Sequence, residues 1–352
     1  MPNIRVNRGV QIYNASDLRK PLLDGGHAFR GYSDTEVLLE NIATFGVWPT
    51  VIKLVGMFAF AVWDRQKKIL TLARDRMGVK PLYYTQQNGA FIFGSVLTAV
   101  SKHPKFSRDI DQNSIASFMR RNYIPGPHSI YQGVMKLKPG TLLTIKEDGT
   151  REQQTYWSVH QAYLDGKARP FEGSDDQAIE ELESLLTDAV QKRLIADVPL
   201  GAFLSGGIDS SLVVALMQKV HSEPVKTFSI GFHETAYNEA PYAKNVAAAL
   251  GTDHTELYVD SKEIQALIPG LPEVFDEPFA DPSQLPTMLV SRMAKEHVTV
   301  CLSGDGGVEL FAGYGRYFLV SKFNRMRRKL PQLSLRGSAA AVKSVPSGVW
   351  ES

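Results

Sequence analysis

The sequence predicts a two-domain protein, in which an N-terminal α+β domain precedes an α/β domain with a doubly wound parallel sheet. The 352 residues exceed the length at which a single hydrophobic core usually stops growing, so two cores are expected. Hairpin signals fill the first half of the chain. In the second half, short apolar runs alternate with helical periodicity, which is typical of a parallel sheet covered by helices.

Turn residues between strand-like runs predict antiparallel hairpins in the first domain. Asn88-Gly89 is a pair that readily takes the positive φ angles of a tight hairpin turn, and Asp148-Gly149 repeats the signal. A polar turn at 64–68 separates a further pair of runs. The strand-like runs are 57–62, 69–73, 82–85, 90–94 and 141–145.

A domain boundary is expected between 157 and 174, because periodicity is lost there and Gly166, Pro170 and Gly173 accumulate. The domains therefore extend over 1–160 and 174–352. Ser174 and Gln177 form a capping box that begins a helix. The runs that follow are strand-like at 201–204, 227–232 and 298–302, and helical at 212–220 and 240–250. Ligands of such sheets bind at the carboxyl ends of the strands.

Composition excludes several functional classes. A hydrophobic fraction of 43% and a charged fraction of 22% are typical of a soluble globular protein. No apolar run approaches the roughly 18 residues that a membrane span needs, and the first residues lack the apolar segment of a signal peptide. The net charge of +2 gives no general attraction for nucleic acid. We expect a cytoplasmic protein that acts on small molecules, without nucleic-acid or membrane partners.

Cysteine and basic residues point to no additional chemistry. Cys301 is the single cysteine and lies in an apolar run, so we expect a buried, inert thiol and no disulfide or cysteine metal cluster. The stretch 322–343 carries seven basic residues and no acidic one. A solvated helix and loop is the favoured interpretation, because no aromatic interleaving accompanies the charge.

One loop predicts phosphate binding. It reads Ser205-Gly206-Gly207-Ile208-Asp209-Ser210-Ser211, after an apolar strand and directly before a helix. Glycines let backbone N–H groups approach an anion, the three serine hydroxyls add donors, and the helix N-terminus favours negative charge. The lysine of the γ-phosphoryl-transferring P-loop is absent. Asp209 beside a phosphate cradle implies a screening cation, for which Mg²⁺ is the expected choice.

The loop resembles the PP-loop of ATP pyrophosphatases, which holds the β and γ phosphates of ATP as the leaving pyrophosphate. Further segments extend this resemblance to the glutamine-hydrolysing asparagine synthetases over nearly the whole chain. The segments in the first domain are Ile12-Tyr13-Asn14, Ser33-Asp34-Thr35-Glu36-Val37 and the stretch 73–84; those in the second are 227–232, Tyr237-Asn238-Glu239, 250–254, Asp276-Glu277-Pro278-Phe279-Ala280-Asp281 and 302–314.

The resemblance implies an Ntn-hydrolase-like β-sandwich at 1–160, which is a class II glutamine amidotransferase domain, and a PP-loop synthetase domain at 174–352. The implied enzyme is a C–N ligase of asparagine biosynthesis. ATP and aspartate would give β-aspartyl-AMP and pyrophosphate, and ammonia, free or released from glutamine, would then give asparagine. ATP and Mg²⁺ are the implied cofactors, and a homodimer is compatible with the family.

Carried over by position, the resemblance assigns the ATP site, a catalytic residue and a glutamine contact. His254 is interpreted as structural or nucleotide-proximal, because adenylation needs no histidine base. For Leu204 and Ile230, ordinary core remains the favoured alternative on sequence alone. The assigned residues are Ser205, Gly206, Gly207, Asp209, Ser210 and Ser211 for the phosphates, with Asp209 also for Mg²⁺; Leu204 and Ile230 for adenine; Ser303 and Gly304 for the nucleotide; Asp305 for catalysis; and Asp34 for glutamine.

The sequence also departs from the family pattern. The family's N-terminal nucleophilic cysteine has no counterpart near Pro2, so we expect a chain truncated at both ends that does not hydrolyse glutamine alone. Gly9-Val10-Gln11 replaces Asn-Gly-Glu of the glutamine pocket. Val308 replaces an aspartate, and Val96 replaces a glutamate near the domain junction.

Two alternatives to asparagine synthesis remain open at this stage. Related loops serve other amide-forming reactions, such as β-lactam closure, and no residue identifies the acceptor carboxylate. The departures above also suit a non-catalytic fragment that binds nucleotide or dimerises with an intact synthetase.

Overall fold

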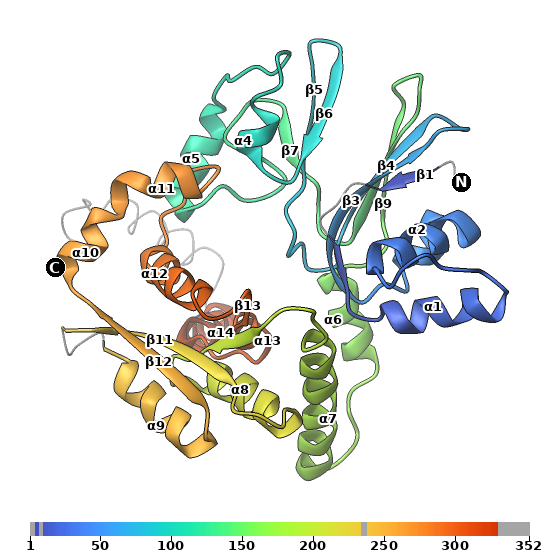
Figure 1. The fold of residues 1–352 in the computed structure, drawn as a ribbon. Helices are drawn as coiled ribbons and strands as arrows, with labels where there is room; N and C mark the ends of the chain where they lie inside the picture. Colours follow the sequence, from blue (N-terminus) through green and yellow to red (C-terminus); the bar gives the residue numbers. More distant parts are fainter. Residues whose placement is uncertain (1–3, 7–9, 234–237, 330–352) are drawn as a thin grey trace.

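The computed structural model of the 352-residue chain describes residues 4–6, 10–233 and 238–329. The expected features at Gly9, at Tyr237 and over 330–343 lie outside these ranges. Figure 1 shows the two predicted parts, with antiparallel strands in the first and a parallel sheet in the second.

The N-terminal domain contains two antiparallel sheets. The six-stranded sheet has the order β1-β3-β4-β8-β9 with β2 paired to β3, and the three-stranded sheet has the order β6-β5-β7. The predicted hairpins are confirmed as β3/β4, β5/β6 and β8/β9, and Asn88 and Gly89 both have positive φ. The strands are β1 Ile4–Val6, β2 Val10–Ile12, β3 Gly56–Asp64, β4 Ile69–Arg74, β5 Tyr83–Gln87, β6 Ala90–Gly94, β7 Val134–Lys136, β8 Thr141–Ile145 and β9 Arg151–Thr155.

Strand β3 separates two cores in this domain, because alternate side chains of a strand point to opposite faces. Phe58 and Phe60 pack with the helices α1 (Ala15–Asp24) and α2 (Asp34–Phe45) on one face. Ala59 and Ala61 pack on the other face, in a cluster that also contains Leu82. The antiparallel α+β class is therefore confirmed, while the specific sandwich arrangement stays a prediction. The remaining helices are α3 Val47–Val51, α4 Leu97–Val100 and α5 Gln112–Arg121.

The segment between the two domains is an exposed connection that contains a helix, which its lack of apolar periodicity did not predict. Helix α6 (Val159–Ala168) begins at the N-cap Ser158, whose hydroxyl accepts a hydrogen bond from the Gln161 amide, 3.1 Å away. None of its residues is buried. An exposed helix needs no apolar stripe, which explains why periodicity did not reveal it. The capping box at Ser174 is confirmed and begins α7 (Asp175–Arg193).

The C-terminal domain contains a four-stranded sheet with the order β12-β11-β10-β13, and every pair in it is parallel. Helices α8 and α9 cover one face, and α12 covers the other. This confirms the predicted parallel sheet; β12 and α12 were not predicted. The strands are β10 Leu200–Phe203, β11 Lys226–Phe232, β12 Asp253–Val259 and β13 Val300–Leu302; the main helices are α8 Ile208–Val220, α9 Ala240–Leu250 and α12 Gln284–Lys295.

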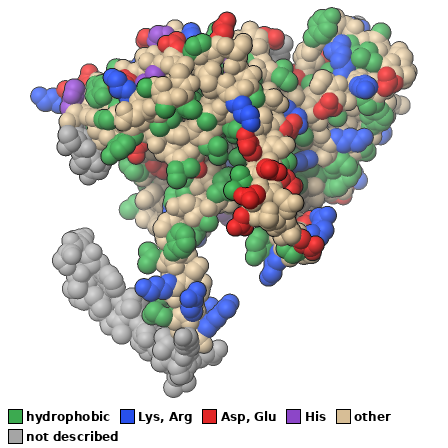
Figure 2. Space-filling view, turned by 90° about the horizontal axis from the view of Figure 1, so that it is seen from below, with side chains coloured by type: hydrophobic (Ala, Val, Ile, Leu, Met, Phe, Trp, Pro, Cys, Tyr) green, Lys and Arg blue, Asp and Glu red, His purple; other side chains and the backbone are tan. Residues whose placement is uncertain are grey.

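Short helices and α14 complete the described part of this domain. They are α10 Ser261–Ala266, the 3₁₀ turn η2 Ile268–Gly270, α11 Leu271–Val274, α13 Gly307–Leu310 and α14 Gly315–Lys329. Basic side chains of α14 are exposed, among them Arg325 and Arg328. Figure 2 shows Lys and Arg side chains grouped on a projecting part of the surface. Within the described ranges, no helix combines the length and the apolar character that a bilayer crossing requires.

Candidate functional site

The predicted phosphate loop connects β10 to α8, as its sequence indicated. Gly206 has a φ of +79°, which favours glycine, and a Cβ atom there would lie 2.6 Å from the Ala243 backbone nitrogen of α9. A side chain would therefore be strained and would also collide with α9. Glycine at this position keeps the turn tight and packed directly on the neighbouring helix.

Helix α8 presents its N-terminus to this loop. Its N-cap is Gly207, which provides no side-chain hydrogen bond to the helix. The first-turn N–H groups of a helix have no intrahelical acceptor, so they are available to an anion. Ile208, the first helical residue, is 86% exposed, which shows that this end of the helix is open to solvent.

Two of the three serines organise the loop. The Ser210 hydroxyl accepts from the Ser205 amide at 3.2 Å and donates to the Gly207 carbonyl at 3.2 Å. The hydroxyls of Ser205 and Ser210 lie 3.0 Å apart, and Ser205 is exposed. The Ser211 hydroxyl is buried and has no partner among the described residues. Ser205 is therefore the serine best placed to meet a ligand, while Ser210 holds the turn.

A second glycine-rich loop, at 303–307, meets the first. It follows β13, which pairs with β10 in parallel, so both loops leave the same edge of the sheet. A Cβ at Gly304 would lie 2.7 Å from the Ser210 amide nitrogen, and one at Gly307 would lie 2.6 Å from the Asp209 carboxyl carbon. Gly304 is required by this close approach because a Cβ would meet backbone, whereas a side chain at position 307 would displace the Asp209 carboxyl group. The structure thus brings Asp209 against the loop that contains the predicted Ser303, Gly304 and Asp305.

Asp305 lies exposed at the tip of the second loop. The Ser303 hydroxyl donates a hydrogen bond to its Oδ2 atom over 2.9 Å. The neighbouring Val308 is only partly exposed, and its Cγ1 atom would lie 3.1 Å from a Cβ at Gly313. Glu309 is exposed, and its carboxylate accepts from the Tyr314 hydroxyl at 2.8 Å, which lowers the pKa of Glu309. Acidic groups therefore remain at this edge although Val308 carries no charge.

The predicted adenine contacts differ in their surroundings. Leu204 is 1% exposed and belongs to the core beneath α8 and α9, and its amide donates to the Phe228 carbonyl. Ile230 lies near the carboxyl end of β11 and is partly exposed. Leu204 thus fits the alternative of ordinary core, whereas Ile230 has an accessible side chain. Both adenine assignments stay predictions.

His254 is part of a polar network between the amino-terminal parts of β11 and β12. Its ring nitrogens lie 2.8 Å from the Thr227 hydroxyl and 3.2 Å from the Ser229 hydroxyl, both on β11. Burial lowers the pKa of His254, and this effect outweighs the attraction of Glu256, 3.8 Å away. A neutral, fully bonded imidazole fits the structural role predicted for this histidine.

Asp34, the predicted glutamine contact, holds strand β2 to helix α2. Its Oδ2 atom accepts from the Ile12 amide at 3.0 Å, and its Oδ1 atom accepts from the Thr35 hydroxyl at 3.3 Å. Asp34 therefore lies beside Gln11, where the sequence departs from the family pattern. Cys301 lies on β13 in the other domain, and burial raises the pKa of its thiol to about 11. Cys301 is partly exposed, so the expectation of a buried thiol was wrong, and its inert character stays a prediction.

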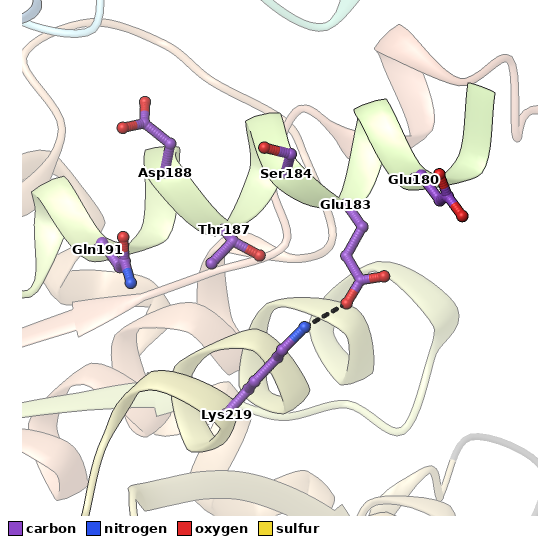
Figure 3. Close-up of a pocket in the computed structure, with 7 residues that line it drawn as sticks. All are labelled: Glu180, Glu183, Ser184, Thr187, Asp188, Gln191 and Lys219. Carbon is purple, nitrogen blue, oxygen red and sulfur yellow. Dashed lines mark hydrogen bonds and ion pairs between the residues drawn. The ribbon is translucent and has the colours of Figure 1, made fainter. Parts of the chain in front are cut away.

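A surface groove of about 410 Å³ lies between α7 and α8, away from both glycine-rich loops. Figure 3 shows the residues that line it. Lys219, which pairs with Glu183 at 2.5 Å, lies in the last turn of α8, whereas the phosphate loop lies at the opposite end of that helix. The lining side chains are Glu180, Glu183, Ser184, Thr187, Asp188, Gln191 and Lys219. This acidic groove does not belong to the predicted site. Among the described residues, no cluster of three or more histidine, cysteine, aspartate or glutamate side chains could hold a metal ion.

The functional interpretation missed Asp276 and Glu277, whose carboxylates contact the other domain. Their segment was recognised only as a family motif. Two adjacent acids before a proline, between short helices, were the available signal for a role outside the local fold.

Comparisons with known proteins agree with this architecture. The glutamine amidotransferase domain family matches residues 5–157, and the asparagine synthase family matches residues 181–350. Asparagine synthetase [glutamine-hydrolyzing] 1 of Bacillus subtilis (strain 168) is 36% identical over 332 residues, covering 94% of this chain and 51% of the relative. A putative asparagine synthetase [glutamine-hydrolyzing] 2 of Methanocaldococcus jannaschii is 37% identical, covering 90% of this chain and 61% of the relative. The chain thus spans between half and two thirds of these relatives.

Proposed function

Because the chain belongs to the glutamine-hydrolysing asparagine synthetase family, we propose that it binds ATP between the two glycine-rich loops and activates aspartate there. The observation that carries this proposal is the contact of Asp209 with the loop at 303–307. Two backbone cradles and one carboxylate meet at the carboxyl edge of a parallel sheet, where such sheets bind their ligands.

In the proposed reaction, a side-chain carboxylate oxygen of aspartate attacks the α-phosphorus of ATP. The bond from that phosphorus to the bridging oxygen breaks, and pyrophosphate leaves with the electron pair. The open N-terminus of α8 and the Ser205 hydroxyl would hold the departing phosphates. Ammonia then attacks the acyl carbon of β-aspartyl-AMP, AMP leaves, and the nitrogen loses a proton to give asparagine.

The residues present fit a magnesium ion that is held partly by the protein and partly by the phosphates of the nucleotide. Mg²⁺ is usually held by one or two carboxylates, waters and substrate phosphates, so a full cage of protein ligands is not required. The carboxyl group of Asp209 lies at the loop contact, where a Cβ at position 307 would displace it. When bound, Mg²⁺ would neutralise phosphate charge. Asp209 would hold it, and the exposed Asp305 would attract the cationic amine of aspartate or incoming ammonium.

We propose that the nitrogen of the product amide comes from ammonia, which is either free or released from glutamine. With free ammonia as the nitrogen source, aspartate-dependent pyrophosphate release should occur. The same assay with glutamine in place of ammonia tests the second source.

Calorimetric titration of the whole chain with ATP and Mg²⁺ tests the nucleotide proposal. Asp209→Asn should weaken Mg-ATP about tenfold, the effect of losing roughly 1.4 kcal/mol, and leave the unfolding temperature unchanged. Asp253→Asn is the matched control, because Asp253 is exposed at the opposite, amino end of β12. Equal affinity in Asp209→Asn and the parent would refute the metal assignment.

A pyrophosphate-release assay separates binding from activation. Release that depends on both ATP and aspartate supports the proposed ligase. Binding of ATP without release would favour a non-catalytic nucleotide-binding chain, for which the uncharged Val308 beside the loop is the motivating observation.

A further inference from the structure

The segment between α11 and α12 reaches across to the amidotransferase domain. Within the described residues, this segment makes polar contacts with parts of the first domain that lie about 150 to 180 positions earlier in the sequence. Asp276 and Glu277 provide the side-chain contacts, and the Ala280 amide donates to the Asn122 carbonyl at 2.8 Å. Figure 1 shows α11 and α12 beside the part of the first domain that contains α5.

Asp276 caps helix α4 from the other domain. Its Oδ2 atom accepts from the Leu97 amide at 2.7 Å, and its Oδ1 atom accepts from the Thr98 amide at 3.0 Å and the Thr98 hydroxyl at 2.7 Å. The local N-cap is Val96, whose side chain cannot accept a hydrogen bond. The N–H groups at the start of α4, which have no acceptor in the described part of the first domain, thus donate to a carboxylate of the second domain.

Glu277 makes a second contact with the first domain, at β7. It pairs with the Lys136 ammonium, and its other carboxylate oxygen accepts from the Ile130 amide at 3.1 Å. The two side chains are only 13% and 17% exposed, so the pair is largely removed from water. Lys136 also donates to the Ile124 carbonyl at 2.8 Å, which satisfies a further N–H of its ammonium group. Such a pair is costly to break, because the remaining charge would be left buried.

The chain leads from these contacts directly to the proposed nucleotide site. Helix α12 packs on β11 through a cluster that contains Phe228 and Met293, and β13 follows. The Thr299 amide donates to the Pro199 carbonyl at 3.0 Å, which fixes the start of β13 beside β10. The loop at 303–307 comes next. A continuous series of packed elements therefore joins Asp276 and Glu277 to that loop.

We propose that Asp276 and Glu277 form an interdomain lock that holds the synthetase domain on the amidotransferase domain and fixes the loop at 303–307. The lock has two points of attachment on separate elements of the first domain, α4 and β7. Two points resist rotation as well as separation, which one exposed ion pair would not do. Val96 is compatible with the lock, because the contact uses backbone groups of α4.

Calorimetric unfolding of the whole chain tests the lock. In the parent, the domains should unfold together; in the double variant Asp276→Asn/Glu277→Gln, the transitions should separate by more than about 4 °C. Glu183→Gln is the matched control, because it removes an exposed pair within the synthetase domain. An unfolding profile of the double variant that coincides with the parent would overturn the proposal.

Hydrogen exchange without nucleotide distinguishes a lock from a local cap. If the lock fixes the loop, the double variant should exchange faster than the parent at 303–307 and in α12, as well as at the amides of Leu97, Thr98 and Ile130. Faster exchange at those three amides alone would show that the carboxylates act only locally. Asp276→Asn by itself retains an acceptor oxygen and should give a smaller change of the same pattern, so the test survives if the double variant fails to fold. Neither measurement depends on ATP binding.

Discussion

The proposed nucleotide site of the synthetase domain depends mainly on backbone, whereas the predicted glutamine pocket of the amidotransferase domain depends mainly on side chains. The first depends on backbone: Gly206, Gly304 and Gly307 let two loops and a helix N-terminus converge. The second would depend on side chains around Gln11 and Asp34, and Asp34 is bonded to the backbone of β2. A site made of backbone keeps its shape while side chains change, whereas a site made of side chains does not.

The consequence is visible at Val308. An aspartate was expected there, yet the loop at 303–307 retains its close contact with Asp209. Loss of one carboxylate leaves the cradle in place and alters its charge. The two sites should therefore respond differently to substitution, since glycine replacement would damage the nucleotide site more than replacement of any one of its side chains.

The largest effect is expected for Gly206→Ala. The positive φ alone disfavours alanine by about 1–2 kcal/mol, and the new Cβ would also meet the Ala243 nitrogen at 2.6 Å. We expect Mg-ATP affinity to fall at least roughly 100-fold, equivalent to about 2.7 kcal/mol. Isothermal titration measures this loss.

Gly149→Ala provides the control for that substitution. Gly149 has a φ of +83°, similar to Gly206, but nothing lies within 4 Å of its Cβ position, and it is in the β8–β9 turn of the other domain. Gly149→Ala should lower the stability of the fold through backbone strain and leave ATP affinity unchanged. Equal affinity losses in both variants would mean that strain anywhere weakens binding, and that the loop contact is unimportant.

Much of the fold was predictable because turn chemistry is local. The conformations of the Asn88-Gly89 turn and of the capping box at Ser174 are each determined by four residues or fewer, and both predictions are confirmed. Helix α6 was missed because it buries nothing, so no apolar periodicity marks it. Strand β12 escaped notice because it is half-buried and carries polar residues such as His254 and Glu256.

The turn at 205–211 between β10 and α8 was predictable for the same local reason, but its neighbours in space were not, and phosphate binding there stays a prediction. The contact of Asp209 with Gly307 joins residues about 100 positions apart, and it exists because β10 and β13 are neighbours in the sheet. No motif spacing contains that information. The capping of α4 by Asp276 is likewise a property of domain docking; from the sequence, Val96 was noted only as the replacement of a glutamate near the domain junction.

A smaller effect in the opposite direction is expected for Val308→Asp. Aspartate is close to valine in size, so the contact with Gly313 should persist, while a carboxylate would be added beside the proposed metal. Aspartate-dependent pyrophosphate release should rise by about tenfold, which corresponds to roughly 1.4 kcal/mol of transition-state stabilisation.

Val308→Asn has a similar shape without the charge and should not increase pyrophosphate release. A rise in pyrophosphate release in both variants would show that a polar side chain is sufficient and that its charge is not needed. If Val308→Asp lowers pyrophosphate release while ATP affinity is unchanged, the view that this site lacks only a carboxylate is contradicted.

The smallest effect concerns pH and the buried His254. The groups that face it are Thr227 and Ser229 on β11, Glu256 on β12 and Lys244 on α9. Burial lowers the pKa of His254 in the folded state, so below the ordinary value of about 6.5 the unfolded chain binds more protons. Stability should therefore fall as pH decreases from 7 through that value.

The measurement is the unfolding temperature between pH 7 and pH 5 for the parent and for His254→Gln. Glutamine can bond to one of the two hydroxyls but cannot take up a proton, so the variant should be less stable at pH 7 and should lose less on acidification. Glu277, whose pKa burial raises, contributes in the opposite sense, and its contribution is common to both proteins and cancels in the difference. Parallel pH profiles for the two proteins would show that His254 is protonated equally in the folded and unfolded states, and the buried network would then have no part in the acid sensitivity of this domain.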